Sequence, residues 1–147
     1  MFEIREAVYA DANRLIELVE ALGFDISFDL LEENLAALAG QGLMPMVADA
    51  GGVIGCVTYN IMPVLHRPAP VGRISMLVVT SSWRGQGVGR ALIEAALERL
   101  RNRGCHLCEV TINLSLVDAH AFYERLGFQK TSVRLGHRLI SAQPQAH

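Results

Sequence analysis

The sequence has no long hydrophobic run and no large excess of one charge, and each absence excludes a class of protein. No apolar stretch approaches the ~20 residues that a helix needs to cross a bilayer. The N-terminus lacks the basic and then apolar pattern of a signal peptide. The 13 basic and 15 acidic residues give a net charge of −2, whereas a nucleic-acid-binding protein usually has a clustered basic face. We expect neither a membrane nor a nucleic acid as partner.

Cysteine is also scarce, since the chain has only three. An odd number implies no disulfide framework, and a reducing cytoplasm is the simplest location. The stretch Cys105-His106-Leu107-Cys108 suggests zinc, but a structural zinc site needs four ligands and the sequence has no second pair. Positions 105 and 108 of a strand also point to opposite faces. We expect buried thiols here and no metal in the protein.

The chain has the size and composition of one folded domain. Its 147 residues are 51% hydrophobic and 19% charged, which fits a globule with a full-sized core. The sequence shows no internal repeat, low-complexity block or linker before its last few residues. We expect a single domain over residues 1–141 and a loose tail over residues 142–147.

Apolar periodicity predicts strands that alternate with helices, which is an α/β or α+β layer structure. The strand over 71–80 is apolar on both faces at its centre, Met76-Leu77-Val78-Val79, as is typical of a central strand covered on both sides. The expected strands are 2–8, 43–49, 53–62, 71–80, 105–113, 128–135 and 138–141, and the expected helices are 12–22, 30–39, 88–103 and 116–126.

Three glycines at every second position precede the helix over 88–103, namely Gly85, Gly87 and Gly89. Glycine lets a bound group approach the backbone and permits positive φ angles. The first N–H groups of a helix have no internal partner and carry the positive end of the helix dipole. This segment is therefore typical of a pyrophosphate site. A sharp turn into the helix would explain the glycines without any ligand.

Two common phosphate loops do not fit this segment. The dinucleotide fingerprint G-x-G-x-x-G would need glycine at position 90 or 92, where the chain has Arg90 and Leu92. The P-loop ends in Gly-Lys-Ser/Thr, a triplet that the chain lacks. The pattern that remains is Arg84-x-x-Gly87-x-Gly89 at a strand-to-helix junction.

Two motifs, in this order, resemble those of the GCN5-related N-acetyltransferase (GNAT) family. The first, Arg84-x-x-Gly87-x-Gly89, is similar to the family's R/Q-x-x-G-x-G/A loop. The second, DAHAFYERLGF over residues 118–128, is similar to its A-x-x-F/L-Y-E-x-x-G-F helix near the C-terminus. A predicted strand separates the two motifs, and the resemblance is strong over residues 71–134.

The resemblance implies an α/β (α+β) fold with a mixed, mostly antiparallel twisted sheet of six to seven strands and four flanking helices. The sheet would splay between its fourth and fifth strands, 71–80 and 105–113. The resemblance also implies acetyl-CoA as cosubstrate, with its pantetheine arm in the splay, and no metal. Backbone groups of Leu77, Val78 and Val79 would pair with this arm, and Asn113 would reach its amides. The pyrophosphate would be held by N–H groups of Arg84, Gly85, Gln86, Gly87, Val88, Gly89 and Arg90.

The resemblance also implies catalytic roles. Tyr123 matches the family's general acid, which protonates the departing thiolate, although packing at the edge of the core would also explain a tyrosine there. Many members of the family place a glutamate on the fourth strand to deprotonate the amine, and that strand has no carboxylate here. Glu109 on the neighbouring strand and His120 on the last helix are the substitutes. We name Glu109, although a surface role explains either residue.

The implied function is transfer of the acetyl group of acetyl-CoA directly to a primary amine of a small molecule, through a ternary complex. Two alternatives stay open. One is N-acetylation of a protein or peptide, which needs an open groove across the sheet. The other is a non-catalytic acyl-CoA sensor, which binds without turnover. The sequence does not name the amine, because specificity lies in the divergent loops. Dimers are common among these folds, so a homodimer is also an option.

Overall fold

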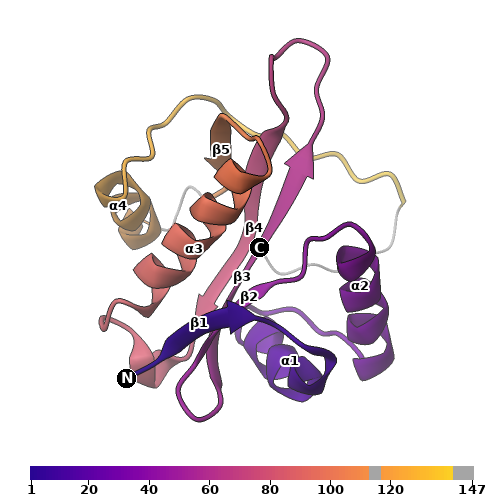
Figure 1. Ribbon diagram of the computed structural model, residues 1–147, viewed down its shortest axis with the longest axis vertical. Coiled ribbons are helices and arrows are strands. Elements are labelled where there is room, and N and C mark those ends of the chain that lie inside the picture. Colours follow the sequence, from indigo (N-terminus) through magenta and orange to yellow (C-terminus); the bar gives the residue numbers. More distant parts are fainter. Residues whose placement is uncertain (113–116, 141–147) are drawn as a thin grey trace. The chain divides into compact units, whose positions relative to one another are not determined.

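The structure, a computed structural model, describes residues 1–112 and 117–140 (Figure 1). The chain divides into two compact units, Met1–Val110 and Thr111–His147, and each is described by itself. The first unit contains the whole sheet, and the second contains the last helix.

The sheet of the first unit has its five strands in sequence order. They are β1 (Glu3–Glu6), β2 (Met46–Asp49), β3 (Val53–Met62), β4 (Val71–Val79) and β5 (Leu107–Val110). Successive strands are antiparallel as far as β4, whereas β4 and β5 are parallel. A parallel pair needs a long crossover connection, and the helix between β4 and β5 provides it. The sheet is therefore mixed and mostly antiparallel, which confirms the expected fold class.

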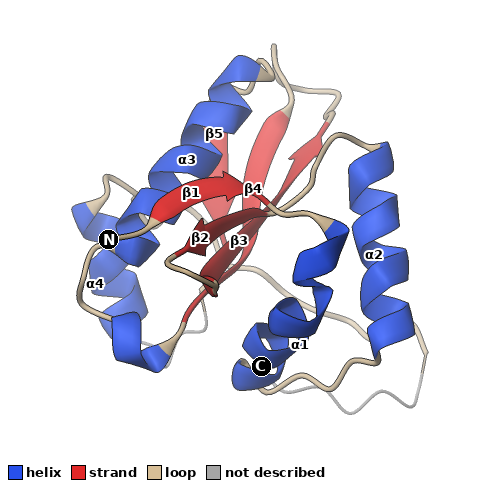
Figure 2. Cartoon of the chain, turned by 60° about the horizontal axis from the view of Figure 1, so that its bottom comes forward, coloured by secondary structure: helices blue, strands red, loops and turns tan. Residues whose placement is uncertain are grey.

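Helices of the first unit cover both faces of this sheet. They are α1 (Ala12–Ala21), α2 (Phe28–Gly40) and α3 (Val88–Asn102), with short 3-10 turns at Tyr9–Asp11 and Ser81–Trp83. Figure 2 shows α3 on one side of the strands and α1 with α2 on the other. The helix α2 begins earlier than predicted because the Ser27 hydroxyl caps it, accepting a hydrogen bond from the Leu30 N–H at 3.1 Å. Within the described residues, no helix is long and apolar enough to span a membrane.

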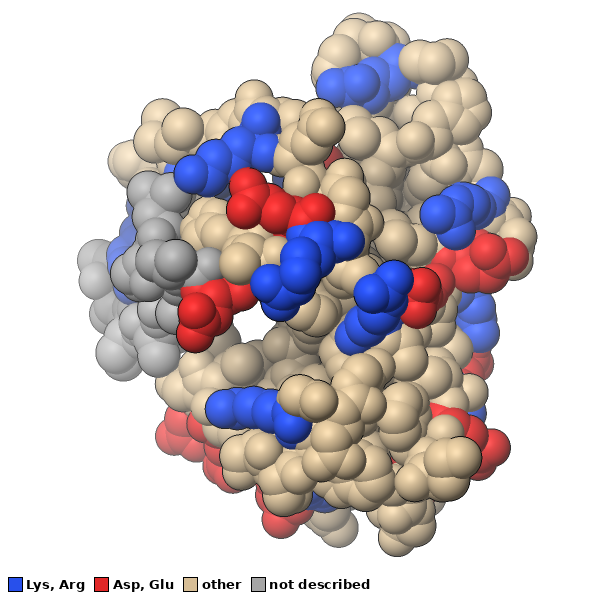
Figure 3. Space-filling view, turned by 90° about the vertical axis from the view of Figure 1, so that its left-hand side faces the viewer, with Lys and Arg blue, Asp and Glu red and all other residues tan. Residues whose placement is uncertain are grey.

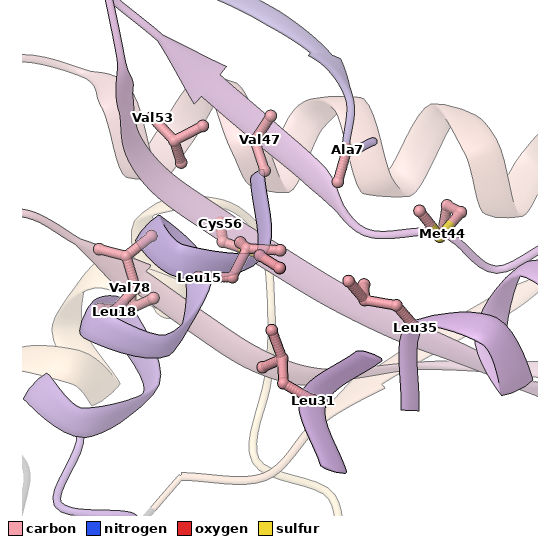
Figure 4. Packing of buried hydrophobic residues seen from close by; sticks show 11 residues of the cluster. Ala7, Leu15, Leu18, Leu31, Leu35, Met44, Val47, Val53, Cys56 and Val78 are labelled. Carbon is pink, nitrogen blue, oxygen red and sulfur yellow. The ribbon is translucent and has the colours of Figure 1, made fainter. Parts of the chain in front are cut away.

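A cluster of buried hydrophobic residues lies between the sheet and the two helices α1 and α2 (Figure 4). The helix α1 contributes Leu15 and Leu18, and α2 contributes Leu31 and Leu35, all of them buried. Residues three or four apart lie on the same face of a helix, which is why the periodicity predicted both helices. Their partners from the strands include Val47, Val53, Cys56 and Val78.

The helix α3 packs against the opposite face of the sheet at very short range. A Cβ atom added to Gly72 would lie 2.7 Å from a methyl carbon of Leu100, and one added to Gly55 would lie 3.1 Å from a methyl carbon of Leu92. Both leucines are completely or almost completely buried. The two glycines therefore face α3, and their lack of a side chain lets the helix lie close to the strands.

An arginine on β1 joins the start of α1 to the end of β2. Arg5 donates hydrogen bonds to both carboxylate oxygens of Asp11, at 2.9 and 3.0 Å, and to one oxygen of Asp49 at 3.0 Å. Asp11 also accepts a hydrogen bond from the Val8 N–H at 2.9 Å. The bonds from Arg5 are the main reason why the pKa of Asp11 lies below its usual range. This network should therefore weaken in acid.

We expect Arg5→Gln to lower the free energy of unfolding by about 1 kcal/mol at neutral pH, because solvent screens a partly exposed ion pair. A carboxyl whose pKa is depressed by folding stabilises the protein above its unfolded pKa of ~3.9. That contribution is lost as the pH falls through the lower, folded pKa. The difference in the free energy of unfolding between variant and wild type should therefore shrink in strong acid. Urea unfolding at neutral pH and at about pH 3 measures this difference. An equal difference at the two pH values would contradict this account.

The second unit contains α4 (Val117–Arg125). The helix ends at Arg125, and Gly127 follows it with a left-handed φ of 94°, as is common after the last turn of a helix. The Gly127 N–H bonds the carbonyl of Glu124 at 3.0 Å, and the Phe128 N–H bonds the carbonyl of Tyr123 at 3.1 Å. With α4, the described residues contain the four helices that were expected.

The strands predicted over 128–135 and 138–141 are not strands in the part of the chain that the structure describes. Residues 129–140 are all exposed, including Val133 at 79% and Leu135 at 90%. Alternating apolar residues form a strand only where a neighbouring edge takes up their hydrogen bonds and one face is buried. The described residues therefore form five strands instead of six or seven. Residues 141–147, with the predicted loose tail, lie outside the described residues.

Candidate active site

The strand β4 is paired with β5 along only part of its length. The ladder between them runs from Val71 to Ile74 and ends there. Ser75–Val79 continue beside β3 but have no partner on the β5 side among the described residues. We call Ser75–Val79 the open edge of β4. Its backbone N–H and C=O groups can bond an extended ligand, as the edge of a sheet bonds an added strand.

A β-bulge lies where the open edge begins. Thr58 pairs with Met76 and Tyr59 pairs with Ile74, so Ser75 is an extra residue without a partner in β3. The hydroxyl oxygens of Thr58 and Ser75 lie 2.8 Å apart and share a hydrogen bond. A bulge bends its strand and increases the local twist. The ladder to β5 ends at this same point, so the bulge marks the start of the open edge.

The loop after β4 presents N–H groups without a cap. Gly85 and Gly87 have φ values of 75° and 84°, which are left-handed and favour glycine. Gly87 is the N-cap residue of α3, whose first turn contains no acidic residue and whose N-cap makes no side-chain hydrogen bond. A Cβ atom added at Gly85 or Gly87 would meet nothing within 4 Å. Open donors, the positive helix end and free space fit an anionic group such as a pyrophosphate.

Side chains fix this loop to the end of β4. Arg84 donates a hydrogen bond from its Nε to the Val79 carbonyl at 3.3 Å. Arg14 of α1 donates from its Nη2 to the Thr80 hydroxyl at 2.8 Å. Gln86 donates to the Ser82 carbonyl at 3.2 Å. These side-chain contacts, with a hydrogen bond from the Arg84 N–H to the Ser81 carbonyl at 3.3 Å, hold the loop against the end of β4.

Positive charge at the loop is local. Arg90, in the first turn of α3, approaches Glu94 at 3.8 Å, and farther along the helix Arg101 approaches Glu98 at 3.5 Å. On the face drawn in Figure 3, basic and acidic side chains alternate and do not gather into one basic field. Attraction of an anion to the loop thus depends on the helix end and the arginines beside it.

Five polar side chains gather on β3, β4 and β5 beside the start of the open edge. Arg73 is at the centre of this group, because in the strand register it lies opposite Asn60 of β3 and opposite Glu109 of β5. Its Nη2 lies 3.2 Å from Oε1 of Glu109, and the two side chains are 33% and 36% exposed. Glu109, the base predicted from the sequence, is therefore held by an arginine. We call this group the β3–β5 polar cluster: Thr58, Asn60, Arg73, Ser75 and Glu109.

Sequence reasoning missed the pairing of Arg73 with Glu109. The sequence does show a charged residue, Arg73, near the start of the apolar strand β4. It does not show which residue pairs with Arg73, because a crossover joins β4 to β5 and their register is set only in the folded sheet.

Tyr123 belongs to the second unit. Its side chain is only 7% exposed and makes edge-to-face contacts with Phe122 and Phe128, at centroid distances of 5.0 and 5.4 Å. Such contacts fix the plane of the ring. The tyrosine is therefore a well-ordered side chain at the position of the expected acid.

The remaining predicted residues have different outcomes. Asn113 lies outside the described residues, so its proposed contact stays a prediction. His120 is half-buried on α4. Cys105 is buried, as expected, whereas Cys108 is only half-buried; burial raises the pKa of the Cys108 thiol to about 11. Residues 1–112 and 117–140 contain no group of three or more potential metal ligands.

Comparison with known proteins decides the family. The model of the Acetyltransferase (GNAT) family matches residues 7–128. The chain belongs to this family. The GNAT match covers the open edge of β4, the glycine loop and α4 together, so both motifs of the sequence fall within it.

Individual GNAT proteins are similar along most of the chain. An aminoalkylphosphonate N-acetyltransferase of Salmonella typhimurium is 30% identical over 135 residues, covering 90% of this chain and 88% of its own. An aminoglycoside N(6')-acetyltransferase of Stenotrophomonas maltophilia is 31% identical over 136 residues, covering 87% and 86%. The solved structure of an aminoglycoside N-acetyltransferase in complex with CoA has the same fold, with a TM-score of 0.80, 21% identity and 94% coverage of both chains.

Proposed function

We propose that the protein transfers the acetyl group of acetyl-CoA directly to a primary amine of a small molecule, within a ternary complex. One observation carries this proposal: the open edge of β4 leads straight into a loop of uncapped N–H groups. The edge fits the amide-bearing pantetheine arm, and the loop fits the pyrophosphate. The fold shared with an acetyltransferase in complex with CoA agrees with this arrangement.

The residues take the following places in the proposal. Backbone groups of Leu77, Val78 and Val79 pair with the pantetheine arm, and Asn113 reaches its amides. The pyrophosphate lies against the backbone N–H groups of 84–90. A backbone N–H near Leu77 or Val78 donates a hydrogen bond to the oxyanion that forms on the thioester carbonyl.

The chemistry moves protons at two atoms: the amine nitrogen loses two and the departing sulfur gains one. An ammonium ion has no free lone pair, so Glu109 takes the first proton from the amine before attack. The amine nitrogen then forms a bond to the carbonyl carbon, and the bond from that carbon to sulfur breaks. Tyr123 donates its proton to the departing thiolate and is reprotonated by the second proton that the nitrogen loses. Because no covalent intermediate on the protein is involved, both substrates must be bound together.

The acceptor is proposed to be a small molecule because both relatives are named for small amines, an aminoalkylphosphonate and an aminoglycoside. The two acceptor classes differ in charge, since a phosphonate is anionic and an aminoglycoside carries several amines. A single catalytic domain over 1–141 and the option of a homodimer remain predictions.

Titration calorimetry with acetyl-CoA tests the proposal first, and we expect a dissociation constant on the order of micromolar. The only tryptophan, Trp83, immediately precedes Arg84, so its fluorescence gives a second readout of the loop. A thiol-release assay with small amines and a lysine-containing peptide follows.

Folded protein that does not bind acetyl-CoA would contradict the proposal. Binding without turnover on any amine would support the acyl-CoA sensor, and turnover on the peptide alone would support protein acetylation.

A further inference from the structure

Arg73 has more hydrogen-bond donors than its neighbours use. Of the five donors of its guanidinium, only Nη2 has a partner among the described residues, the carboxylate of Glu109. Its Nε is shielded from solvent and has no hydrogen-bond partner within residues 1–112 and 117–140. Buried polar groups are nearly always bonded, so an unbonded donor calls for a functional explanation. The side chain as a whole is 33% exposed, so part of it is open to solvent.

Arg73 lies on the face of the sheet opposite α3. Its neighbour Gly72 faces α3, and successive residues of a strand point to opposite faces. Met76 packs against the core on the side of α1 and α2, across from Thr58. The contact between the hydroxyls of Thr58 and Ser75 shows that these two side chains lie on the same face of the sheet as each other, the face of Met76. The β3–β5 polar cluster is thus one polar surface on the face that α3 does not cover.

The position of Arg73 along β4 relates it to the reaction. The glycine loop follows the C-terminal end of β4, so a cosubstrate held there by its pyrophosphate would extend back along the open edge from Val79 toward Ile74, where the ladder to β5 closes. Arg73 is the next residue, and Glu109 lies opposite it on β5. The acyl end of such a cosubstrate would then point toward this ion pair.

We propose that Arg73 binds an anionic group of the acceptor, so that the acceptor is an amine that also carries a phosphonate, phosphate or carboxylate group. This inference rests on the proposed function and names the substrate class of that site. The planar guanidinium donates paired hydrogen bonds that match the oxygens of such groups. Glu109, bonded to Arg73 through one oxygen, presents its other oxygen to the ammonium group. The ion pair thus complements a zwitterion.

The same geometry disfavours other acceptors. A polycationic amine would place like charge beside Arg73, and like charges across an interface weaken binding strongly. A neutral alkylamine would leave the unused Nη donors of Arg73 without a partner. The order of preference should be anionic amines first, neutral amines second and polycationic amines last.

The test compares acceptors of matched length: aminoethylphosphonate, β-alanine, propylamine and, as polycation, kanamycin. Arg73→Gln should raise KM for the two anionic amines by about 10- to 100-fold, the value of a charged hydrogen bond, and should raise KM for propylamine much less. Because Arg73 also holds Glu109, any change in kcat should be of similar size for every acceptor. Arg73→Lys, which keeps the charge, should recover part of the loss. Arg101→Gln, an exposed arginine of α3, is the matched control and should behave as wild type.

Binding is also measured directly, by titrating aminoethylphosphonate into protein saturated with CoA. If amines are acetylated but propylamine or kanamycin is preferred, or if Arg73→Gln raises KM by the same factor for all acceptors, the inference is overturned while the proposed function stands. If aminoethylphosphonate binds through Arg73 but no amine is acetylated, the proposed transfer fails while the inference stands. Preference for β-alanine over aminoethylphosphonate supports the inference and identifies a carboxylate as the anionic group.

Discussion

Replacement of Tyr123 by phenylalanine is expected to lower kcat by about 10²- to 10⁴-fold, the usual contribution of a well-placed acid. The affinity for acetyl-CoA should change little, because the ring keeps its buried position and its edge-to-face contacts with Phe122 and Phe128. Steady-state kinetics with saturating amine, beside calorimetric titration of acetyl-CoA, separates the two quantities.

Tyr59→Phe is the matched control for this experiment. Tyr59 is 1% exposed, and its hydroxyl donates a hydrogen bond to the Met44 carbonyl at 3.2 Å, within the first unit. Loss of that bond should lower the free energy of unfolding by about 1 kcal/mol without changing kcat. If kcat of Tyr123→Phe at saturating substrate equals that of the wild type, Tyr123 is not the acid.

Replacement of Gly87 by glutamate is expected to abolish measurable binding of acetyl-CoA. The φ of 84° at Gly87 suits glycine, and another residue there is strained by roughly 1–2 kcal/mol. The new carboxylate would also lie at the positive end of α3, where the pyrophosphate is proposed to bind. Repulsion between like charges should raise the dissociation constant by at least about 100-fold. Calorimetry and Trp83 fluorescence both report the loss.

Two variants separate charge from backbone strain. Gly104 follows the other end of α3 with a φ of 88°, and a Cβ atom added there meets nothing within 4 Å. Gly104→Glu therefore carries a similar strain away from the loop and should bind acetyl-CoA normally. Gly87→Ala adds the strain alone and should weaken binding much less than Gly87→Glu. Wild-type affinity in a folded Gly87→Glu protein would remove the pyrophosphate from this loop.

The sequence predicted the elements whose signals are local. Apolar periodicity predicted the helices α1 and α2 and the two neighbouring strands β2 and β3. The segment 128–135 also alternates, but a strand needs a partner edge and a buried face, and its described residues have neither. The sequence pattern alone does not contain that information.

The site was predictable to the same extent. The glycine spacing at 85, 87 and 89 located the loop, because positive φ and open donors are local properties. The bulge at Ser75 was not predictable, since strand periodicity assumes uninterrupted alternation and an extra residue shifts its phase. The pairing of Arg73 with Glu109 depends on the register of two strands joined by a crossover.

The open edge of β4 also affects the protein before any ligand binds. A run of β-branched and apolar residues with unpaired backbone groups is a template for addition of a strand from another molecule, and hence for aggregation. A ligand that bonds this edge occupies the template and stabilises the folded state by mass action. In a cell, the supply of acyl donor would then influence how much of the protein stays intact, as well as how fast it works.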